Sequence, residues 1–430
     1  MEHTSLKTRI KSHYHWVVAA VVLIEFAVAC GFTNNLYSLY LIPITEDLGV
    51  SRSAFSVSPS IRYFSSFFSN LIFAMFYNRH GYRKLATMTF AVTGVMYLIY
   101  SRAQNLIPFY VGAAIVGILE AFYSTASASR MITDWFHKHQ GLILGVVMAS
   151  SGLSSSVFTV MMTNVMEKGS FRNAMTLSAL FLFATAVLIV VFARNKPADM
   201  GLEPMGEEHH KQAERKKYAR KNLKEWDGIP RKELRKKAFF YTQILGTFLF
   251  TLTIYAVYPS IISHAQDVGL SADDAALLHS SMFLILAGAK VVEGALVDKF
   301  GAKPVMYLCL ILNAASIVIM IFAKTFVMIF LALIIFSLPL AAPTIMVPTL
   351  TAEQFGRHDY GSLLGIFLAS GSISGVMAFP SLNMIYDRVG SYVPGYLVMT
   401  VLACAAIVLF AISFRGAARE RARFEAAKAE

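Results

Sequence analysis

Long apolar runs separated by short polar turns dominate the chain. Each of twelve such runs is long enough, at about 1.5 Å rise per helical residue, to cross a hydrocarbon core about 30 Å thick. None shows the alternation of polar and apolar positions that a membrane β-barrel needs. The pattern therefore predicts an all-α membrane protein with twelve transmembrane helices. The predicted spans are 15–43, 54–77, 84–102, 106–132, 140–166, 171–194, 238–264, 272–297, 303–323, 327–351, 361–385 and 391–414.

Composition supports the same class of protein. The mean hydropathy is +0.56 and only 15% of the residues are charged, which does not describe a water-facing surface. Cys30, Cys309 and Cys404 all fall inside apolar spans without the spacing of metal ligands. We therefore expect neither a disulfide nor a metal site.

The distribution of the excess positive charge predicts the topology. The net charge of +12 would suggest nucleic acid as a partner of a soluble protein. Here the cations gather at the N-terminus, after the second, fourth and eighth spans, and at the C-terminus, all on one predicted side. The positive-inside rule puts both termini in the cytoplasm, and we expect no nucleic-acid partner. The basic start and the apolar run ending at Cys30 also suit a secretory signal peptide, but the run continues through Leu41, so we interpret it as the first span.

An internal repeat appears when the chain is compared with itself at an offset of 220 residues. The segment AMFYNRHGYRK from Ala74 lies over GALVDKFGAKP from Gly294, and GLILGVVMAS from Gly141 lies over GSLLGIFLAS from Gly361. Six crossings return the chain to the same side, so the repeats are parallel. The predicted domains are a six-helix bundle over 1–194, a basic linker over 195–237, and a second six-helix bundle with its tail over 238–430. The linker is either a solvated connection or a binding segment for anionic headgroups.

Glycine spacing and proline content give two further expectations. Gly141 and Gly145, like Gly361 and Gly365, expose bare backbone at i and i+4, which predicts close helix contacts of the fifth and eleventh spans. The tenth span contains three prolines, each of which removes a backbone donor, so we expect it to bend. These prolines are Pro339, Pro343 and Pro348.

The loops after the second and eighth spans resemble the signature Gly-x-x-x-Asp-Arg-x-Gly-Arg-Arg/Lys of the major facilitator superfamily. The second copy matches with Gly294, Asp298, Lys299, Gly301 and Lys303. The first copy has Asn78, Arg79 and Gly81, with Ala74 in place of the glycine and Asn78 in place of the acid. The strings LGVSRSAFSVSPSI from Leu48, PADMGLEPMG from Pro197 and YGSLLGIFLASGSISG from Tyr360 are similar to the branch of monocarboxylate porters and oxalate/formate antiporters.

This resemblance implies a fold and a mode of action. It implies the major facilitator fold, with a substrate held between two halves that expose it alternately. It also implies that a cation in the eighth helix holds a substrate carboxylate, and Lys290 is the candidate in place of the arginine usual in the family. The signature residues of both loops are expected to control conformational change. Arg130, near the cytoplasmic end of the fourth span, is expected to act as a gate or to contact headgroups.

Five ionisable side chains lie deep within the predicted spans, away from their ends: Glu25, Arg62, Glu120, Lys290 and Glu293. Each costs about 2.5 to 3.5 kcal/mol at the centre of a membrane helix, so each needs a partner, a wet cavity or a function. Glu25, Glu120 and Glu293 are our candidates for proton coupling, and the alternative for Glu25 and Glu120 is a permanent ion pair with Arg62 or Lys290. Lys290 and Glu293, at i and i+3, either form a local ion pair or bind substrate, with Glu293 keeping the empty lysine charged.

Polar side chains near the ends of two helices are candidate substrate ligands. Asn34, Asn35 and Tyr37 lie on the first span, and Tyr255 and Tyr258 lie on the seventh. They offer hydrogen bonds to a small polar ligand, although tyrosines near a helix end also anchor helices at the membrane interface.

The sequence predicts a secondary transporter for a small organic anion such as a monocarboxylate, working by proton symport or anion exchange. The three buried acids outnumber the two bases, which favours the alternative of a proton-coupled exporter of a cationic or drug-like solute. A receptor that binds without transport is a third class. We find no Gly-Lys-Ser/Thr loop, metal-ligand cluster or nucleophile elbow, so we expect no enzyme activity and no cofactor. The expected partners are a small carboxylate, protons and the bilayer of the cell membrane, with the protein acting as a monomer.

Overall fold

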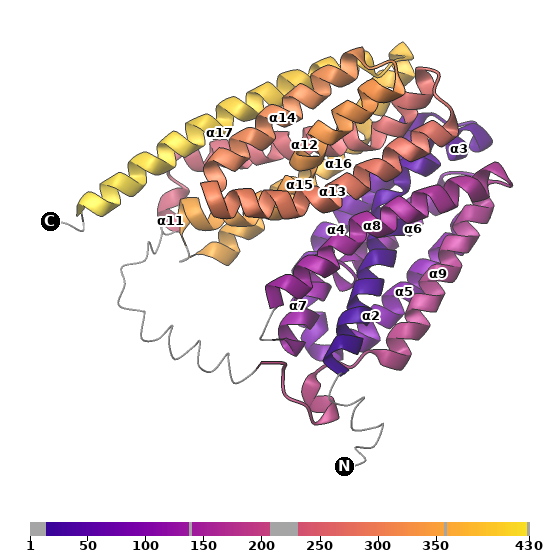
Figure 1. Ribbon diagram of the computed structural model, residues 1–430, viewed down its shortest axis with the longest axis horizontal. Helices are drawn as coiled ribbons and strands as arrows, with labels where there is room; N and C mark the ends of the chain where they lie inside the picture. The colour runs from indigo at the N-terminus through magenta and orange to yellow at the C-terminus, as the bar shows by residue number, and fades with distance from the viewer. Residues whose placement is uncertain (1–13, 137–139, 207–230, 357–358, 428–430) are drawn as a thin grey trace, which may run out of the picture. The chain divides into compact units, whose positions relative to one another are not determined.

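The computed structural model describes residues 14–136, 140–206, 231–356 and 359–427, and nearly all of them are helical (Figure 1). In the first part of the chain the elements are α2 (Tyr14–Ala29), the π-helix η1 (Cys30–Asn35), α3 (Tyr37–Leu48), α4 (Arg52–His80), α5 (Tyr82–Tyr100), α6 (Ile107–Leu119), the 3-10 helix η2 (Glu120–Phe122), α7 (Thr125–Trp135), α8 (Gln140–Glu167), α9 (Phe171–Phe192) and the 3-10 helix η3 (Pro197–Met200).

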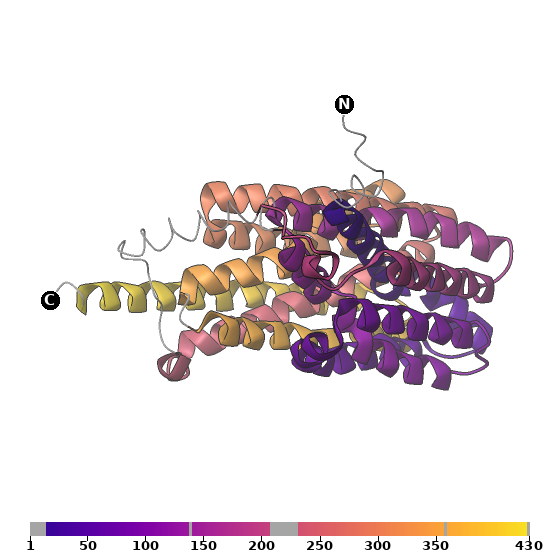
Figure 2. The same cartoon turned by 90° about the horizontal axis from the view of Figure 1, so that it is seen from below.

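The second part of the chain consists of fewer, longer helices. They are α11 (Arg231–Leu234), α12 (Ala238–Asp267), α13 (Ala272–Phe300), α14 (Ala302–Phe322), α15 (Phe326–Phe355), α16 (Tyr360–Val389) and α17 (Val393–Ala427). Figure 2 shows the long helices running side by side within each part.

Within the described residues, ten helical stretches are long and apolar enough to cross a membrane. The helices α4 and α5 have the positions of the second and third predicted spans and complete the twelve. The α4 helix falls below the hydropathy of the other ten because its sequence is rich in serine and polar residues. The prediction of an all-α membrane protein with twelve transmembrane helices is confirmed.

Close contacts divide the chain into two compact units, which we describe separately. Unit 1 comprises residues 1–37 and 65–224, and unit 2 comprises 38–64 and 225–430. The division cuts α4 between Phe64 and Ser65. Residues 38–64, although they belong to the first two predicted spans, therefore pack with helices of the second half of the chain.

The helix bounds and packing show that the sequence repeat is also a structural repeat. Adding 220 to the bounds of α4 gives those of α13, and the starts of α5 and α8 become those of α14 and α16. In unit 1, α2 packs on α8 and α9, and α5 packs on α9; in unit 2, α12 packs on α16 and α17, and α14 packs on α17. Gly81 and Gly301 share a left-handed conformation, with φ of 76° and 81°. Only glycine adopts this conformation without strain, so the loop geometry is conserved between the repeats.

The prediction that glycines mediate close helix contacts of the fifth and eleventh spans is wrong at two positions. A Cβ added to Gly145 or Gly365 would meet no atom within 4 Å. Serine hydroxyls reach neighbouring helices instead. Ser370 donates to the carbonyl of Ile244 at 3.0 Å, and its repeat partner Ser150 lies 3.4 Å from the carbonyl of Leu23 while donating to Val147 of its own helix at 2.6 Å. Such hydrogen bonds join helices where the membrane offers no hydrophobic driving force.

Interruptions of the helices do not follow the prolines. The first span changes from α-helix to the π-helix η1, and the fourth span is broken by η2. The tenth span, α15, remains a single helix through its three prolines. Turns of π-helix and 3-10 helix inside a longer helix occur most often at functional sites.

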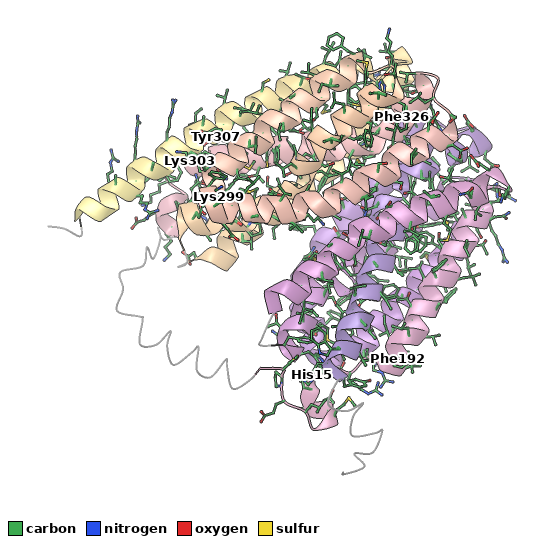
Figure 3. All side chains as sticks on the ribbon, in the orientation of Figure 1. His15, Phe192, Lys299, Lys303, Tyr307 and Phe326 are labelled. Atoms are coloured by element: carbon green, nitrogen blue, oxygen red, sulfur yellow. The ribbon has the colours of Figure 1, made fainter. Side chains whose placement is uncertain are left out.

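The described ends of the linker pack against their own units. In unit 1, the amide of Met205 donates to the carbonyl of Trp135 at 2.9 Å, and a ring nitrogen of His15 lies 2.8 Å from the carbonyl oxygen of Glu203. His15 and Phe192 lie together at this end of unit 1 (Figure 3). In unit 2, Leu234 is fully buried among Phe239, Phe240 and Phe355. The remainder of the predicted linker, residues 207–230, lies outside the described residues.

Candidate functional site

Glu25 is buried inside unit 1. It lies on α2 with 1% of its surface exposed, and its Oε2 accepts a hydrogen bond from the hydroxyl of Tyr82, the first residue of α5. Its other oxygen has no hydrogen-bond partner within the described residues. The described part of the chain gives Glu25 no ion pair either. A buried carboxylate without a cation is costly when ionised, so this side chain suits a group that exchanges a proton.

Glu120 lies where the fourth span is interrupted. It is the first residue of η2, between α6 and α7, and it is half-buried. The neighbouring amide of Ala121 donates to the hydroxyl of Ser69 on α4 at 3.0 Å. The break therefore uses a side chain to satisfy a backbone donor that a continuous helix would satisfy itself.

Lys290 and Glu293 lie on α13 in unit 2. Lys290 is half-buried, whereas Glu293 is fully buried. The thiol of Cys309 on α14 donates to Oε1 of Glu293 at 3.7 Å, and Oε2 has no hydrogen-bond partner among the described residues. The charge of Lys290 acts on Glu293, as expected of residues at i and i+3 on one helix face. The two side chains thus combine an accessible cation with a buried acid.

The π-helix η1 contains two of the candidate substrate ligands. Asn34 and Asn35 are half-buried, and Asn35 donates to the hydroxyl of Ser155 on α8 at 2.7 Å. The hydroxyl of Thr33 donates to the carbonyl of Ala29 at 2.7 Å and so compensates part of the altered backbone bonding. Tyr37 follows η1 and is half-buried. Sequence reasoning missed the π-helix; its two adjacent asparagines disfavour a regular helix but do not specify this one.

Arg62 belongs to an aromatic cluster of unit 2. Its guanidinium lies 4.9 Å from the ring centre of Tyr63, and the side chain is buried. Tyr63 packs on Tyr255 at 5.5 Å and on Phe379 at 5.3 Å, and Tyr258 meets Phe379 edge-on at 6.3 Å. Tyr258 is buried and Tyr255 half-buried, and both pack within this aromatic cluster of unit 2.

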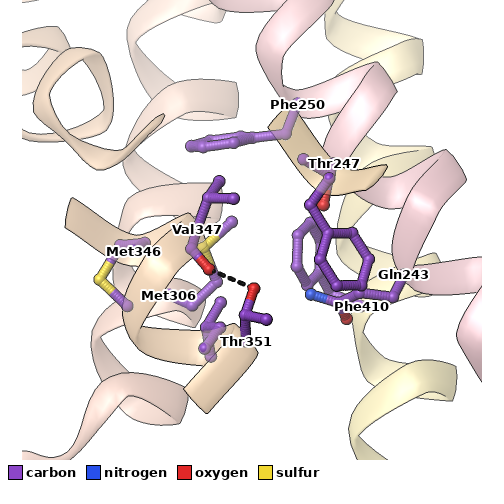
Figure 4. Close-up of a pocket in the computed structure, with 10 residues that line it drawn as sticks. Gln243, Thr247, Phe250, Met306, Met346, Val347, Thr351 and Phe410 are labelled. Atoms are coloured by element: carbon purple, nitrogen blue, oxygen red, sulfur yellow. Dashed lines mark hydrogen bonds between the residues drawn. The ribbon is translucent and has the colours of Figure 1, made fainter. Parts of the chain in front are cut away.

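A small cavity lies inside unit 2 (Figure 4). Water has about 10 Å³ available in it, which is room for about one water molecule and too little for a carboxylate solute. Gln243, Thr247 and Thr351 are its polar lining residues, and the hydroxyl of Thr351 is bonded to the carbonyl of Val347 at 2.7 Å. We therefore do not assign this cavity to the substrate.

The two signature loops differ in what surrounds them. In unit 1, Asn78 and Arg79 are exposed, and Gly81 is held against Asn195, whose side chain lies 2.8 Å from the Cβ that Gly81 lacks. In unit 2, Gly294 and Gly301 have open space at the corresponding point. Asp298 and Lys299 are exposed, with the ammonium of Lys299 5.2 Å from the ring of Phe300.

Arg130 forms a surface ion pair. Its Nε lies 3.2 Å from the carboxylate of Asp134, one turn further along α7, and half of the arginine side chain is exposed. The guanidinium also lies 6.0 Å from the ring of Tyr77. Exposed i,i+4 pairs contribute about 0.3–0.5 kcal/mol, so this pair can re-form at little cost.

The twelve-helix fold, the duplicated signature loops and the buried ionic groups define a polytopic transporter. Comparison with protein families gives its family. The model of the major facilitator superfamily matches residues 21–251 and 243–430. The chain belongs to this superfamily and is a membrane transporter, not an enzyme.

Two relatives span much of the chain. The uncharacterized MFS-type transporter YcxA of Bacillus subtilis is 20% identical over 386 residues, which cover 86% of this chain and 89% of that protein. Monocarboxylate transporter 12 of Rattus norvegicus is 22% identical over 325 residues, covering 71% of this chain and 66% of that protein. Among solved structures, a bacterial homolog of the human lysosomal transporter Spinster, in an inward-facing and occupied conformation, has a TM-score of 0.69 at 14% identity and covers 95% of this chain and 97% of its own. At this identity the likeness concerns the fold alone.

Proposed function

We propose that the protein is a secondary transporter of a small organic anion, with Lys290 as the group that binds the substrate carboxylate. The observation that carries the proposal is a half-buried lysine on a membrane-spanning helix, one turn from a buried acid. A cation at that depth needs a counter-charge, which Glu293 supplies in the empty protein and a substrate carboxylate supplies when it binds. The similarity to monocarboxylate transporter 12 supports an anionic substrate of this size.

Glu25 and Glu120 take the role of proton carriers in this proposal, and Glu293 holds Lys290 in its charged form between substrates. Asn34, Asn35, Tyr37, Tyr255 and Tyr258 supply hydrogen bonds, and Arg62 adds a second positive charge. The signature loops and Arg130 accompany the alternating-access cycle, either as proton symport or as anion exchange. The protein would act as a monomer in the cell membrane with both termini in the cytoplasm.

Transport by purified protein in liposomes tests the substrate assignment. Lys290→Ala is expected to lower uptake of a labelled monocarboxylate at least about tenfold, since a hydrogen bond to a charged group contributes about 1.5–3 kcal/mol. Lys290→Arg keeps the charge and is expected to retain part of the activity. Lys324→Ala, which removes an exposed cation of the same unit, is the matched control. Carboxylate uptake by Lys290→Ala at the parent rate would end the proposal.

Export of a cationic solute is the second candidate. The three acids and two bases deep within the spans leave a net charge of −1 there, which favours a cation. In that case Glu25→Gln and Glu120→Gln would abolish proton-driven movement of a cationic dye, whereas Lys290→Ala would not. The same set of variants therefore separates the two functions.

A further inference from the structure

A network of charged and aromatic side chains surrounds Arg52 at one end of unit 2. Arg52 begins α4, directly after the short turn that follows α3. Its two terminal nitrogens donate to the two oxygens of Asp267, the last residue of α12, at 2.9 and 3.0 Å. A bidentate pair of this kind is stronger and more directional than an ordinary surface ion pair.

Two tyrosines hold the arginine in place. The guanidinium lies 4.0 Å from the ring centre of Tyr386, whose hydroxyl donates to Asp267 at 3.1 Å. Arg52 also donates to the hydroxyl of Tyr392 at 3.2 Å. The side chains of Arg52 and Asp267 are only 16% and 22% exposed, so the pair is partly shielded from water and salt.

The network continues from this ion pair into the interior. Tyr392 donates to the amide oxygen of Asn383 at 2.7 Å, and Asn383 donates to the hydroxyl of Ser56 at 2.6 Å. On the other side, the backbone amide of Ser53 donates to the carboxylate of Asp387 at 3.0 Å. This carboxylate satisfies one of the free amides at the start of α4, where the helix dipole also favours a negative charge.

These contacts bear on motion of the protein because α4 is divided between the two units. Residues 52–64 of this helix are grouped with unit 2, and residues 65–80 of the same helix are grouped with unit 1. Two further contacts tie residues 38–64 to the helices of unit 2: Ser38 lies 2.9 Å from a ring nitrogen of the buried His279, and Tyr63 packs on Tyr255 and Phe379. Arg52 and Asp267 contribute an ion pair to this attachment.

We propose that this network is a latch that holds residues 38–64 against the helices of unit 2 and must open during the working cycle. We call it the Arg52 latch; it comprises Arg52, Ser53, Ser56, Asp267, Asn383, Tyr386, Asp387 and Tyr392. The charge pattern of the sequence predicts that this end of the helices faces away from the cytoplasm. When the latch opens, the interior of unit 2 beneath it becomes accessible from the side away from the cytoplasm. The inference concerns the gate alone and does not depend on which solute is carried.

The rate at which a maleimide labels a buried cysteine next to the latch tests the proposal. Ser60 is 7% exposed and lies one turn beyond Ser56, so Ser60→Cys reports opening. The full chain in liposomes is treated with a membrane-impermeant maleimide, and the protein without the reporter gives the background. Arg52→Ala and Asp267→Asn are each expected to raise the labelling rate of Ser60→Cys about tenfold, as loss of a charge-assisted hydrogen bond predicts. Arg52→Lys keeps the charge but loses the bidentate geometry and the stacking. Its labelling rate is expected to lie between that of these two variants and that of the parent.

A matched control removes the same charge nearby without touching the latch. Asp273 is an exposed acid in the first turn of α13. In Asp273→Asn the labelling rate of Ser60→Cys is expected to stay within about twofold of the parent rate, because surface substitutions usually have small effects. The exchange Arg52→Asp with Asp267→Arg restores the opposite charges and is expected to recover at least half of the lost protection. Equal labelling of Asp267→Asn and Asp273→Asn would overturn the proposal, as would a double exchange that labels like the single variants. If Arg52→Ala does not fold, Arg52→Lys and Asp267→Asn decide the question.

Discussion

Glu25 in unit 1 and Glu293 in unit 2 are both buried carboxylates, yet they occupy unrelated positions of the two repeats. At the offset of 220 residues, Glu25 corresponds to Leu245 and Glu293 corresponds to Phe73. Glu25 is bonded to a tyrosine at the start of the third helix of its repeat, whereas Glu293 is bonded to a cysteine within the corresponding helix. The ionic groups are therefore not duplicated.

The scaffold around these groups is duplicated in detail. Gly81 and Gly301 make the same turn, and Ser150 and Ser370 both face a carbonyl of a neighbouring helix, at 3.4 and 3.0 Å. Features required to fold a six-helix bundle are thus preserved in both copies, while the buried ionic groups appear once. Differences between the repeats are the better guide to function, and matched variants in the two units test this.

The largest expected difference concerns proton coupling. Glu25→Gln should abolish accumulation driven by a proton gradient and leave exchange of labelled for unlabelled substrate intact, because glutamine keeps the shape but cannot release a proton. Glu293→Gln should retain gradient-driven accumulation and lower the KM for the anion about twofold to fivefold, since the acid no longer competes for Lys290. Uptake and exchange in liposomes measure both. Gradient-driven accumulation by Glu25→Gln at the parent level would contradict the assignment.

The next largest expected difference is in stability, between glycine variants of the two signature loops. Alanine at either Gly81 or Gly301 must adopt a positive-φ conformation with ψ of 162° or 164°, which is essentially restricted to glycine and costs about 1–3 kcal/mol. Gly81→Ala also pushes against Asn195, which accepts a hydrogen bond from the amide of Arg83 at 2.9 Å, so about 1 kcal/mol more is expected there. Gly301→Ala has open space and should show the conformational cost alone. Thermal unfolding in detergent compares them, and equal destabilisation would show that Asn195 simply moves aside.

The bonds to the two acids give a smaller contrast. Tyr82→Phe leaves both oxygens of a buried carboxyl without a partner and should lower the free energy of unfolding by about 1–3 kcal/mol. Cys309→Ala removes only a weak thiol donor and should cost about 1 kcal/mol or less, mostly for the space it leaves. Chemical unfolding of the two variants in one detergent measures the difference. A larger loss for Cys309→Ala would mean that packing, and not hydrogen bonding, dominates at both acids.

The fold was predictable from the sequence because it depends on local, repeated signals. Apolar length defines the spans, charge placement gives a topology, and the offset of 220 residues identifies the repeat, even though α4 is too rich in serine to pass as a span by hydropathy. The glycine spacings misled us at Gly145 and Gly365 because a small residue permits a close contact without requiring one. Serines 150 and 370 carried that role, and serine spacing was not used as a signal.

The surroundings of the candidate residues were less predictable, because they depend on contacts between distant segments. Depth along a helix identified Glu25 as buried and ionisable, but the bond to Tyr82 joins positions 57 residues apart. The Arg52 latch joins Arg52 to Asp267 over 215 residues, and in the sequence Arg52 is merely one of the few cations on the predicted outer face. The breaks at η1 and η2 contain no proline, so no local signal of the usual kind announces them.

The smallest expected effect tests whether the duplicated scaffold is energetically equal in its two copies. Ser370→Ala removes one hydroxyl bond between helices and should lower the free energy of unfolding by about 0.6 kcal/mol, the average for such bonds in membrane bundles. Ser150→Ala should cost less, because the Ser150 hydroxyl donates to the carbonyl of Val147 in its own helix at 2.6 Å and lies 3.4 Å from that of Leu23. The double variant should lose the sum of the two, because the two sites share no partner. Ser372→Ala is the control, since its exposed hydroxyl donates to Leu368 of its own helix. An equal loss at Ser150 and Ser370 would show that the two copies of the scaffold share their energetics as well as their geometry, because the 3.4 Å contact of Ser150 would then contribute as much as the 3.0 Å bond of Ser370.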